Sequence, residues 1–148
     1  MKVIDSPAGV ARLIGDVAAE PSLVYEYFTN EDRIVRWWAE QATTDIRLDG
    51  EYELAWPSQG TRLLGSYVVV DPGVRLAFTW AFAHEPTNPS TVDIQFSPIA
   101  GGTELTIEHS HGDDPDERQG YIDGWKFFIG RLRDALAEDP DAGSPGAE

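Results

Sequence analysis

Residues 115–137 read PDERQGYIDGWKFFIGRLRDALA, and their apolar side chains recur at steps of three and four residues. This spacing places the side chains along one side of an α-helix, because 3.6 residues make one turn. The stretch therefore predicts one long amphipathic helix near the end of the chain. The recurring positions are Tyr121, Trp125, Phe128, Ile129, Leu132 and Leu136.

The sequence before this helix has a period of two. Apolar and other residues alternate in the run Val10–Val17 and again in several runs between Thr43 and His111, which is typical of half-buried strands. Gly- and Pro-containing turn signals separate the later runs. These signals are Asp49-Gly50, Pro57–Gly60, Asp71–Gly73 and Ala100–Gly102.

Two short helices are expected between the first strand and the rest of the strands. Pro21 or Ser22 begins the first helix, and Thr29 or Asn30 caps the second. The order is then one strand, two short helices, about six strands and one long helix. Strands that run together favour an α+β fold with an antiparallel sheet. One helix covers such a sheet only if the sheet curves around it, and that geometry leaves a cavity between them.

A single domain is expected over residues 10–137, with loose termini at 1–9 and 138–148. The last eleven residues are rich in Asp, Pro, Gly, Ala and Ser and have no apolar periodicity. The whole chain has 148 residues, a common size for one domain with its own core.

The composition argues against several classes of protein. The 26 acidic and 11 basic residues give a net charge of -15, which repels nucleic-acid phosphates and anionic lipids. We therefore expect neither nucleic acid nor a membrane as a partner. Cysteine is absent, so disulfides, thiolate nucleophiles and Cys-type zinc sites are excluded. A cytoplasmic location is expected, since the N-terminus lacks a signal-peptide pattern.

Several segments, in this order, also carry a family resemblance. They are the opening Val17–Thr29, the pair in Arg36-Trp37-Trp38, the segment Asp71–Trp80, the hairpin Gly102–Thr106 and the helix with Gly124-Trp125. They resemble the corresponding parts of the SRPBCC superfamily, which includes START and birch-pollen-allergen-like proteins. The most similar branch is named after the activator of the ninety-kilodalton heat-shock protein's ATPase. The resemblance implies a helix-grip fold, in which a curved antiparallel sheet of about six to seven strands wraps around the C-terminal helix.

The inward faces of these elements suggest a cavity for a small hydrophobic or aromatic molecule. The candidate ligand-binding residues are Trp38, Tyr52, Trp56, Phe78, Trp80, Phe96, His109, Tyr121 and Trp125. The alternative is that the tryptophans simply fill the core. Large aromatic rings pack well there, but their N–H groups need partners when buried.

His109 and His111 lie two residues apart on one predicted strand, so their side chains face the same way. A structural histidine with both nitrogens satisfied is one interpretation. A polar anchor or general base in the cavity wall is another, because a neutral imidazole both donates and accepts. A metal site would need a third ligand such as His84 or Asp113, and nothing fixes one in place. We therefore expect no metal and no cofactor, and His109 is the only candidate for a catalytic residue.

Three functions are compatible with these features of the sequence. The first is a carrier, sensor or sequestering protein for a hydrophobic molecule, favoured because the inward faces hold few ionisable residues. The second is a cyclase- or hydrolase-like enzyme that uses His109 as acid or base. The third is a co-chaperone-like interaction module, which would present a large exposed apolar patch. A homodimer is compatible with each of them.

Overall fold

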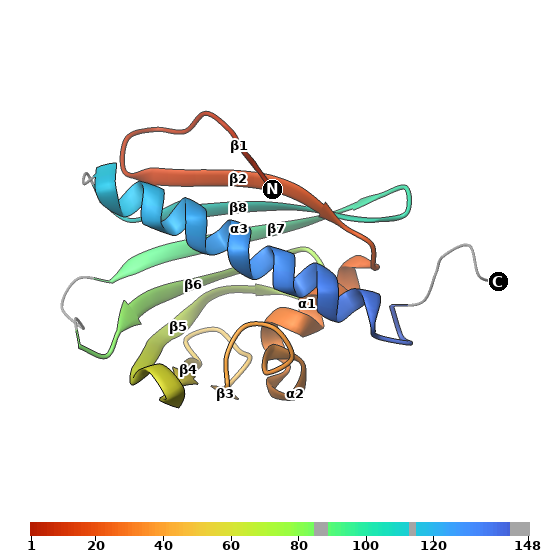
Figure 1. The fold of residues 1–148 in the computed structure, drawn as a ribbon, viewed down its shortest axis with the longest axis horizontal. Coiled ribbons are helices and arrows are strands. Elements are labelled where there is room, and N and C mark those ends of the chain that lie inside the picture. The colour runs from red at the N-terminus through yellow and green to blue at the C-terminus, as the bar shows by residue number, and fades with distance from the viewer. Residues whose placement is uncertain (85–88, 113–114, 143–148) are drawn as a thin grey trace.

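One long helix, α3 (Pro115–Ala137), lies across the concave face of one curved sheet in the computed structural model (Figure 1). The structure describes residues 1–84, 89–112 and 115–142. All neighbouring strands are antiparallel, in the order β1-β2-β8-β7-β6-β5-β4-β3. The predicted α+β helix-grip fold is confirmed, and the described residues form eight strands instead of six or seven. The strands are β1 Lys2–Val3, β2 Val10–Val17, β3 Gln41–Thr44, β4 Glu51–Trp56, β5 Thr61–Asp71, β6 Arg75–Phe82, β7 Ser90–Ile99 and β8 Gly102–Ser110.

The extra strand is the short edge strand β1, which pairs with β2. Lys2 lies opposite Ile14, and Val3 lies opposite Leu13. The expectation of a loose N-terminus is therefore wrong for these two residues. Two residues are too few to show an alternating pattern, so this pairing could not be predicted from periodicity.

The C-terminal segment also differs in part from the expected loose tail. Residues 143–148 lie outside the described residues. Just before them, Asp139 is buried, and its carboxylate accepts a hydrogen bond from the hydroxyl of Tyr27. The same carboxylate pairs with Arg33 at 2.7 Å and Arg36 at 3.3 Å. These contacts fix the end of α3 against the two short helices.

Those helices, α1 (Pro21–Thr29) and α2 (Glu31–Ile34), follow β2 as predicted. Pro21 occupies the first turn of α1. Asn30, one of the two candidate caps, caps the N-terminus of α2, because its side chain accepts hydrogen bonds from the backbone N–H groups of Asp32 and Arg33. The chain after α2 carries Trp37 and Trp38 into the core, where their rings stack 5.1 Å apart.

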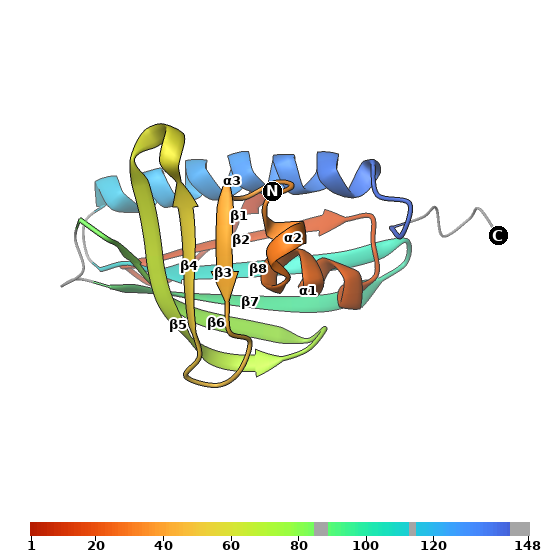
Figure 2. The same cartoon turned by 90° about the horizontal axis from the view of Figure 1, so that it is seen from below.

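Strong curvature brings the far end of the sheet up beside α3. Strand β5 has an irregularity between Tyr67 and Val69, and a bulge of this kind bends a strand. Gly65 permits a very close approach of β6, since a Cβ atom there would lie 2.0 Å from the carbonyl oxygen of Thr79. Figure 2 shows the hairpin of β4 and β5 rising to the level of α3, with the 3-10 helix η1 (Pro57–Gln59) at its tip. The hairpin therefore forms a wall facing the side of α3.

Candidate ligand-binding site

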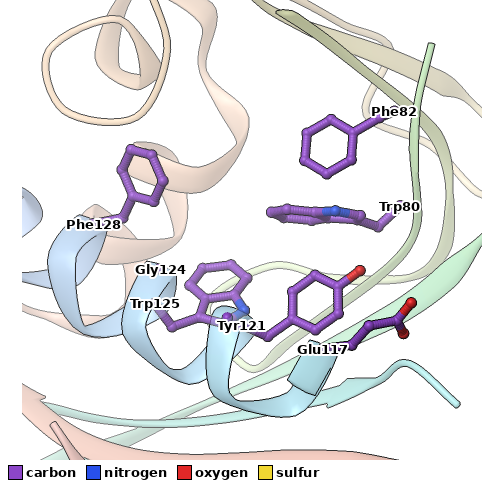
Figure 3. Close-up of a pocket in the computed structure, with 8 residues that line it drawn as sticks. Trp80, Phe82, Glu117, Tyr121, Gly124, Trp125 and Phe128 are labelled. Carbon is purple, nitrogen blue, oxygen red and sulfur yellow. The ribbon is translucent and has the colours of Figure 1, made fainter. Parts of the chain in front are cut away.

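A pocket of about 360 Å³ opens between α3 and the end of β6 (Figure 3). In the figure, Trp80 and Phe82 face Tyr121, Trp125 and Phe128 across the space. Most of the lining is thus aromatic, which suits an apolar ligand. We call this space the aromatic pocket, and its lining residues are Trp80, Phe82, Glu117, Gly120, Tyr121, Gly124, Trp125 and Phe128.

The aromatic pocket exists because α3 lies toward one side of the sheet. The helix approaches β2 most closely, and Arg133 donates a hydrogen bond from Nε to the carbonyl of Asp16 in β2 at 3.0 Å. On its other side, Gly120 and Gly124 stand one turn apart and line the pocket. A Cβ atom at either glycine would meet no atom within 4 Å. The missing side chains therefore leave open volume next to the aromatic rings.

A second pocket of about 460 Å³ adjoins the first along α3. The two share Trp80, Phe82 and Phe128 as lining residues. The second pocket is bounded by the end of α2, the hairpin of β4 and β5, and α3. Its lining is more polar, because it also includes Glu40, Gln59, Thr61 and Arg131.

His109, the one catalytic candidate, is fully buried and has hydrogen bonds at both ring nitrogens. Trp125 Nε1 lies 3.1 Å from His109 Nδ1, and Ser90 Oγ lies 2.7 Å from His109 Nε2. An indole only donates, so Nδ1 must accept and Nε2 must carry the proton. The hydroxyl of Ser90 in turn faces the carbonyl of Trp80 at 3.4 Å. Burial, with a smaller contribution from His111, lowers the pKa of His109 to about 3.

The structure separates the nine predicted ligand-binding residues into distinct environments. Trp80, Tyr121 and Trp125 line the aromatic pocket, and Trp38 and Trp56 line the second pocket. The other four, Tyr52, Phe78, Phe96 and His109, lie elsewhere in the core.

Aromatic side chains occupy the deep part of the predicted cavity. Tyr52 and Phe78 pack edge to face at 5.4 Å beside a void of only about 10 Å³. Phe96 packs against Tyr25 at 5.3 Å and Phe28 at 5.7 Å. These residues fill the core, so the open volume lies toward the edge of α3 and not beneath its centre.

Phe82, Gly120, Gly124 and Phe128 line the aromatic pocket although they were not among the candidates. Phe82 follows Trp80 by two residues on the same strand, so alternation alone would have placed it beside Trp80. The two glycines are four residues apart within an otherwise amphipathic helix. That spacing was the available signal for an uncovered strip on the helix.

In the part of the chain that the structure describes, metal-ligating side chains do not gather at either pocket. Within residues 1–84, 89–112 and 115–142, no group of three or more His, Asp or Glu side chains could hold a metal ion. Asp113, considered as a third ligand, lies outside the described residues. Over the same part of the chain, no helix combines the length and apolar character required to cross a bilayer.

Solved structures with the same fold include proteins of varied origin. A protein from the dynemicin biosynthetic locus, DynU16, is 24% identical with a TM-score of 0.80; the alignment covers 94% of this chain and 49% of that one. This chain therefore spans about half of that protein. CalU16 from Micromonospora echinospora is 24% identical, with a TM-score of 0.73 and coverages of 93% and 83%. The Aha1 dimer from Colwellia psychrerythraea is 16% identical, with a TM-score of 0.76 and coverages of 85% and 94%.

These similarities show the fold, and a family model adds the relationship in sequence. Comparison with curated proteins gave no match. Residues 18–137 match the model described as activator of Hsp90 ATPase homolog 1-like protein. The match runs from the end of β2 through the whole of α3, which includes every element around the two pockets. This chain belongs to the family of activator of Hsp90 ATPase homolog 1-like proteins.

Proposed function

We propose that the protein binds a small apolar aromatic molecule in the aromatic pocket, as a carrier, sensor or sequestering protein. The observation that carries the proposal is an open volume of about 360 Å³ between aromatic rings and the bare Gly120–Gly124 strip. Small-molecule pockets typically have volumes of roughly 300 to 1,000 Å³ and mostly apolar walls. Trp80 and Trp125 offer flat surfaces against which a planar ligand can stack.

The geometry of His109 favours binding over the cyclase- or hydrolase-like alternative. A general base must lie within hydrogen-bond reach of the proton that it removes. His109 is 0% exposed, and Trp125 and Ser90 occupy its two nitrogens. It therefore acts as a buried link between β8, β7 and α3, and we do not include it in the proposed ligand site.

Filling the aromatic pocket from its glycine side tests the proposal. We expect Gly124→Leu to weaken the binding of naphthalene at least about tenfold, because the new side chain occupies the volume the ligand needs. The substitution should not lower stability, since a Cβ atom at this position meets no atom within 4 Å and leucine is a better helix former than glycine. Equilibrium dialysis measures the dissociation constant, and thermal unfolding measures stability.

Gly130→Leu is the matched control. Gly130 lies on the same helix with the same open space around its Cβ position, but it lines neither pocket. The control should bind naphthalene like the wild type. Equal binding by the wild type and Gly124→Leu, or no binding by the wild type, would contradict the proposal.

Self-association is a second candidate function, favoured by an exposed aromatic side chain on α3. Phe127 is 60% exposed and Val35 is 43% exposed, and both line the second pocket. The related structure from Colwellia psychrerythraea is described as a dimer. If the surface around Phe127 and Val35 joins two copies of this chain, Phe127→Glu should shift the protein toward the monomer in sedimentation equilibrium. An unchanged mass would exclude this surface as the interface.

A further inference from the structure

A small polar compartment of about 30 Å³ adjoins the aromatic pocket at its Glu117 end. The two spaces share Trp80, Phe82, Glu117 and Tyr121. Figure 3 shows the Tyr121 hydroxyl and the Glu117 carboxylate together at this end, directed away from Phe128. The compartment adds Ala81, Ser90 and His111 to the lining. Its size is suitable for one water-sized group.

His111 is the unusual residue of this compartment. Its side chain is 1% exposed, yet neither ring nitrogen has a hydrogen-bond partner in the described part of the chain. The nearest carboxylate oxygen, Glu117 Oε2, lies 3.9 Å from Nδ1, which is too far for a hydrogen bond. Trp80 Nε1 is likewise buried without a partner. Buried polar groups are nearly always satisfied, so two unsatisfied side chains beside one pocket require a physical cause.

Packing alone does not explain the histidine. The ring of His111 lies against Tyr121 with centroids 5.5 Å apart, a contact that phenylalanine would also make. Phenylalanine would bring no unpaired nitrogen into the interior. His109, two residues earlier, shows the contrasting case, because both of its nitrogens have partners within the protein. His111 therefore has unused hydrogen-bonding capacity at the end of an apolar pocket.

We propose that the ligand is a hydroxylated aromatic ring system, of the phenol or naphthol class, whose hydroxyl occupies the compartment beside His111 and Glu117. This inference rests on the proposed function, since the ring system fills the aromatic pocket. A hydroxyl donates one hydrogen bond and accepts one or two. It can donate to the Glu117 carboxylate or to an imidazole nitrogen, and it can accept from the imidazole or from Trp80 Nε1.

Other polar groups suit this end of the pocket less well. A ligand carboxylate would be repelled by Glu117, and the chain's net charge of -15 adds to the repulsion. An ammonium group has no acceptor to offer the unpaired Trp80 N–H. A purely apolar ligand would leave both His111 and Trp80 unsatisfied. The hydroxyl is the smallest group that fits the volume and meets a donor and an acceptor together.

Two probes that differ only in the hydroxyl test this inference. We expect the wild-type protein to bind 2-naphthol about tenfold more tightly than naphthalene, because the hydroxyl forms hydrogen bonds that the hydrocarbon lacks. In His111→Phe this advantage should fall to about twofold or less, while naphthalene binding stays unchanged. Equilibrium dialysis gives both dissociation constants under the same conditions.

A second variant keeps the inference testable if His111→Phe fails to fold. Glu117→Gln should also reduce the advantage of 2-naphthol, and the side chain of Glu117 is 44% exposed, so the fold tolerates the change. Asp134→Asn removes the same charge from an exposed position of α3 and should leave the advantage intact.

Each outcome decides between the two proposals. If the wild type binds naphthalene and 2-naphthol equally well, the hydroxyl compartment is refuted and the aromatic pocket stands. The same conclusion follows if 2-naphthol keeps its advantage over naphthalene in both His111→Phe and Glu117→Gln. If neither probe binds the wild type, the proposed function fails, and this inference fails with it. A naphthol advantage that both variants lose, and that Asp134→Asn keeps, supports the assignment.

Discussion

Trp125→Ala is expected to lower the free energy of unfolding by about 3 to 5 kcal/mol, the range for truncating a large buried aromatic residue. The side chain is 3% exposed and lies between the sheet and α3. Its ring centroid lies 5.8 Å from that of Trp38 and 5.7 Å from that of Trp80. Alanine would leave a cavity at the point where these three rings meet.

The same substitution removes the only donor that faces His109 Nδ1 among the hydrogen bonds of the described residues. Trp125→Phe separates the two contributions, since phenylalanine keeps a ring in place and loses the indole N–H. We expect a loss of about 1 to 3 kcal/mol for Trp125→Phe, because a buried acceptor is left unpaired. Urea unfolding at pH 7 measures both variants. A loss below about 1 kcal/mol for Trp125→Ala would mean that the ring does not hold α3 to the sheet.

The order of helices and strands could be predicted because most of the segments are long enough to show their periodicity. The helix Pro115–Ala137 has the predicted bounds, and β2 has the bounds of the predicted run Val10–Val17. Strands β4 to β8 lie between Thr43 and His111, where the other alternating runs were predicted. These segments cover enough residues for a period of 3.6 or 2.0 to show. The edge strand β1 was missed because its two residues are too few to show a period.

The position of the pocket could be predicted only in part. Alternation identifies which side chains face inward, and it placed Trp80 and Trp125 correctly on the inner side. It does not determine how far the helix lies from each strand. That distance depends on how α3 rests near β2 and on the two glycines that leave its other side bare. The aromatic residues near the sheet centre consequently fill the core, and the open volume lies at the side.

The roles of the two histidines also depended on contacts that no pattern reveals. His109 and His111 share a strand face, so the sequence treats them alike. In the structure, Ser90 and Trp125 happen to reach His109, whereas no such partner reaches His111 in the described residues. Ser90 lies in β7 and Trp125 lies in α3, and both are far from His109 in the sequence. The candidate for a ligand contact is therefore not His109 but His111, the next residue along on the same strand face.

The carboxylate of Asp139 joins the end of α3 to the short helices, although composition alone placed it in a loose tail. We expect Asp139→Asn to lower the free energy of unfolding at pH 7 by about 2 kcal/mol. Breaking a buried ion pair costs about 3 to 5 kcal/mol, and the half-exposed Arg36 reduces the effect. Asp141→Asn is the matched control, because Asp141 also pairs with Arg33, at 3.1 Å, but its side chain is 69% exposed. The control should lose less than about 1 kcal/mol.

The stabilisation from Asp139 should also depend on pH. The hydrogen bond from Tyr27, the backbone N–H of Asp141 and the charges of Arg33 and Arg36 together hold the pKa of Asp139 below its ordinary value. A carboxyl group whose pKa is lower in the folded state stabilises the fold fully above its unfolded pKa of about 3.9. That stabilisation is lost as the pH falls through the folded pKa, since the protonated group no longer pairs with the arginines.

The difference in stability between wild type and Asp139→Asn should therefore stay constant above about pH 5 and shrink below about pH 4. Urea unfolding measured at several pH values between 3 and 7 follows this difference directly. Asparagine carries no charge over this range, so the variant itself lacks this contribution to the pH dependence. A difference that is small at pH 7 or that grows as the pH falls would show that the carboxylate does not anchor α3 to Arg33 and Arg36.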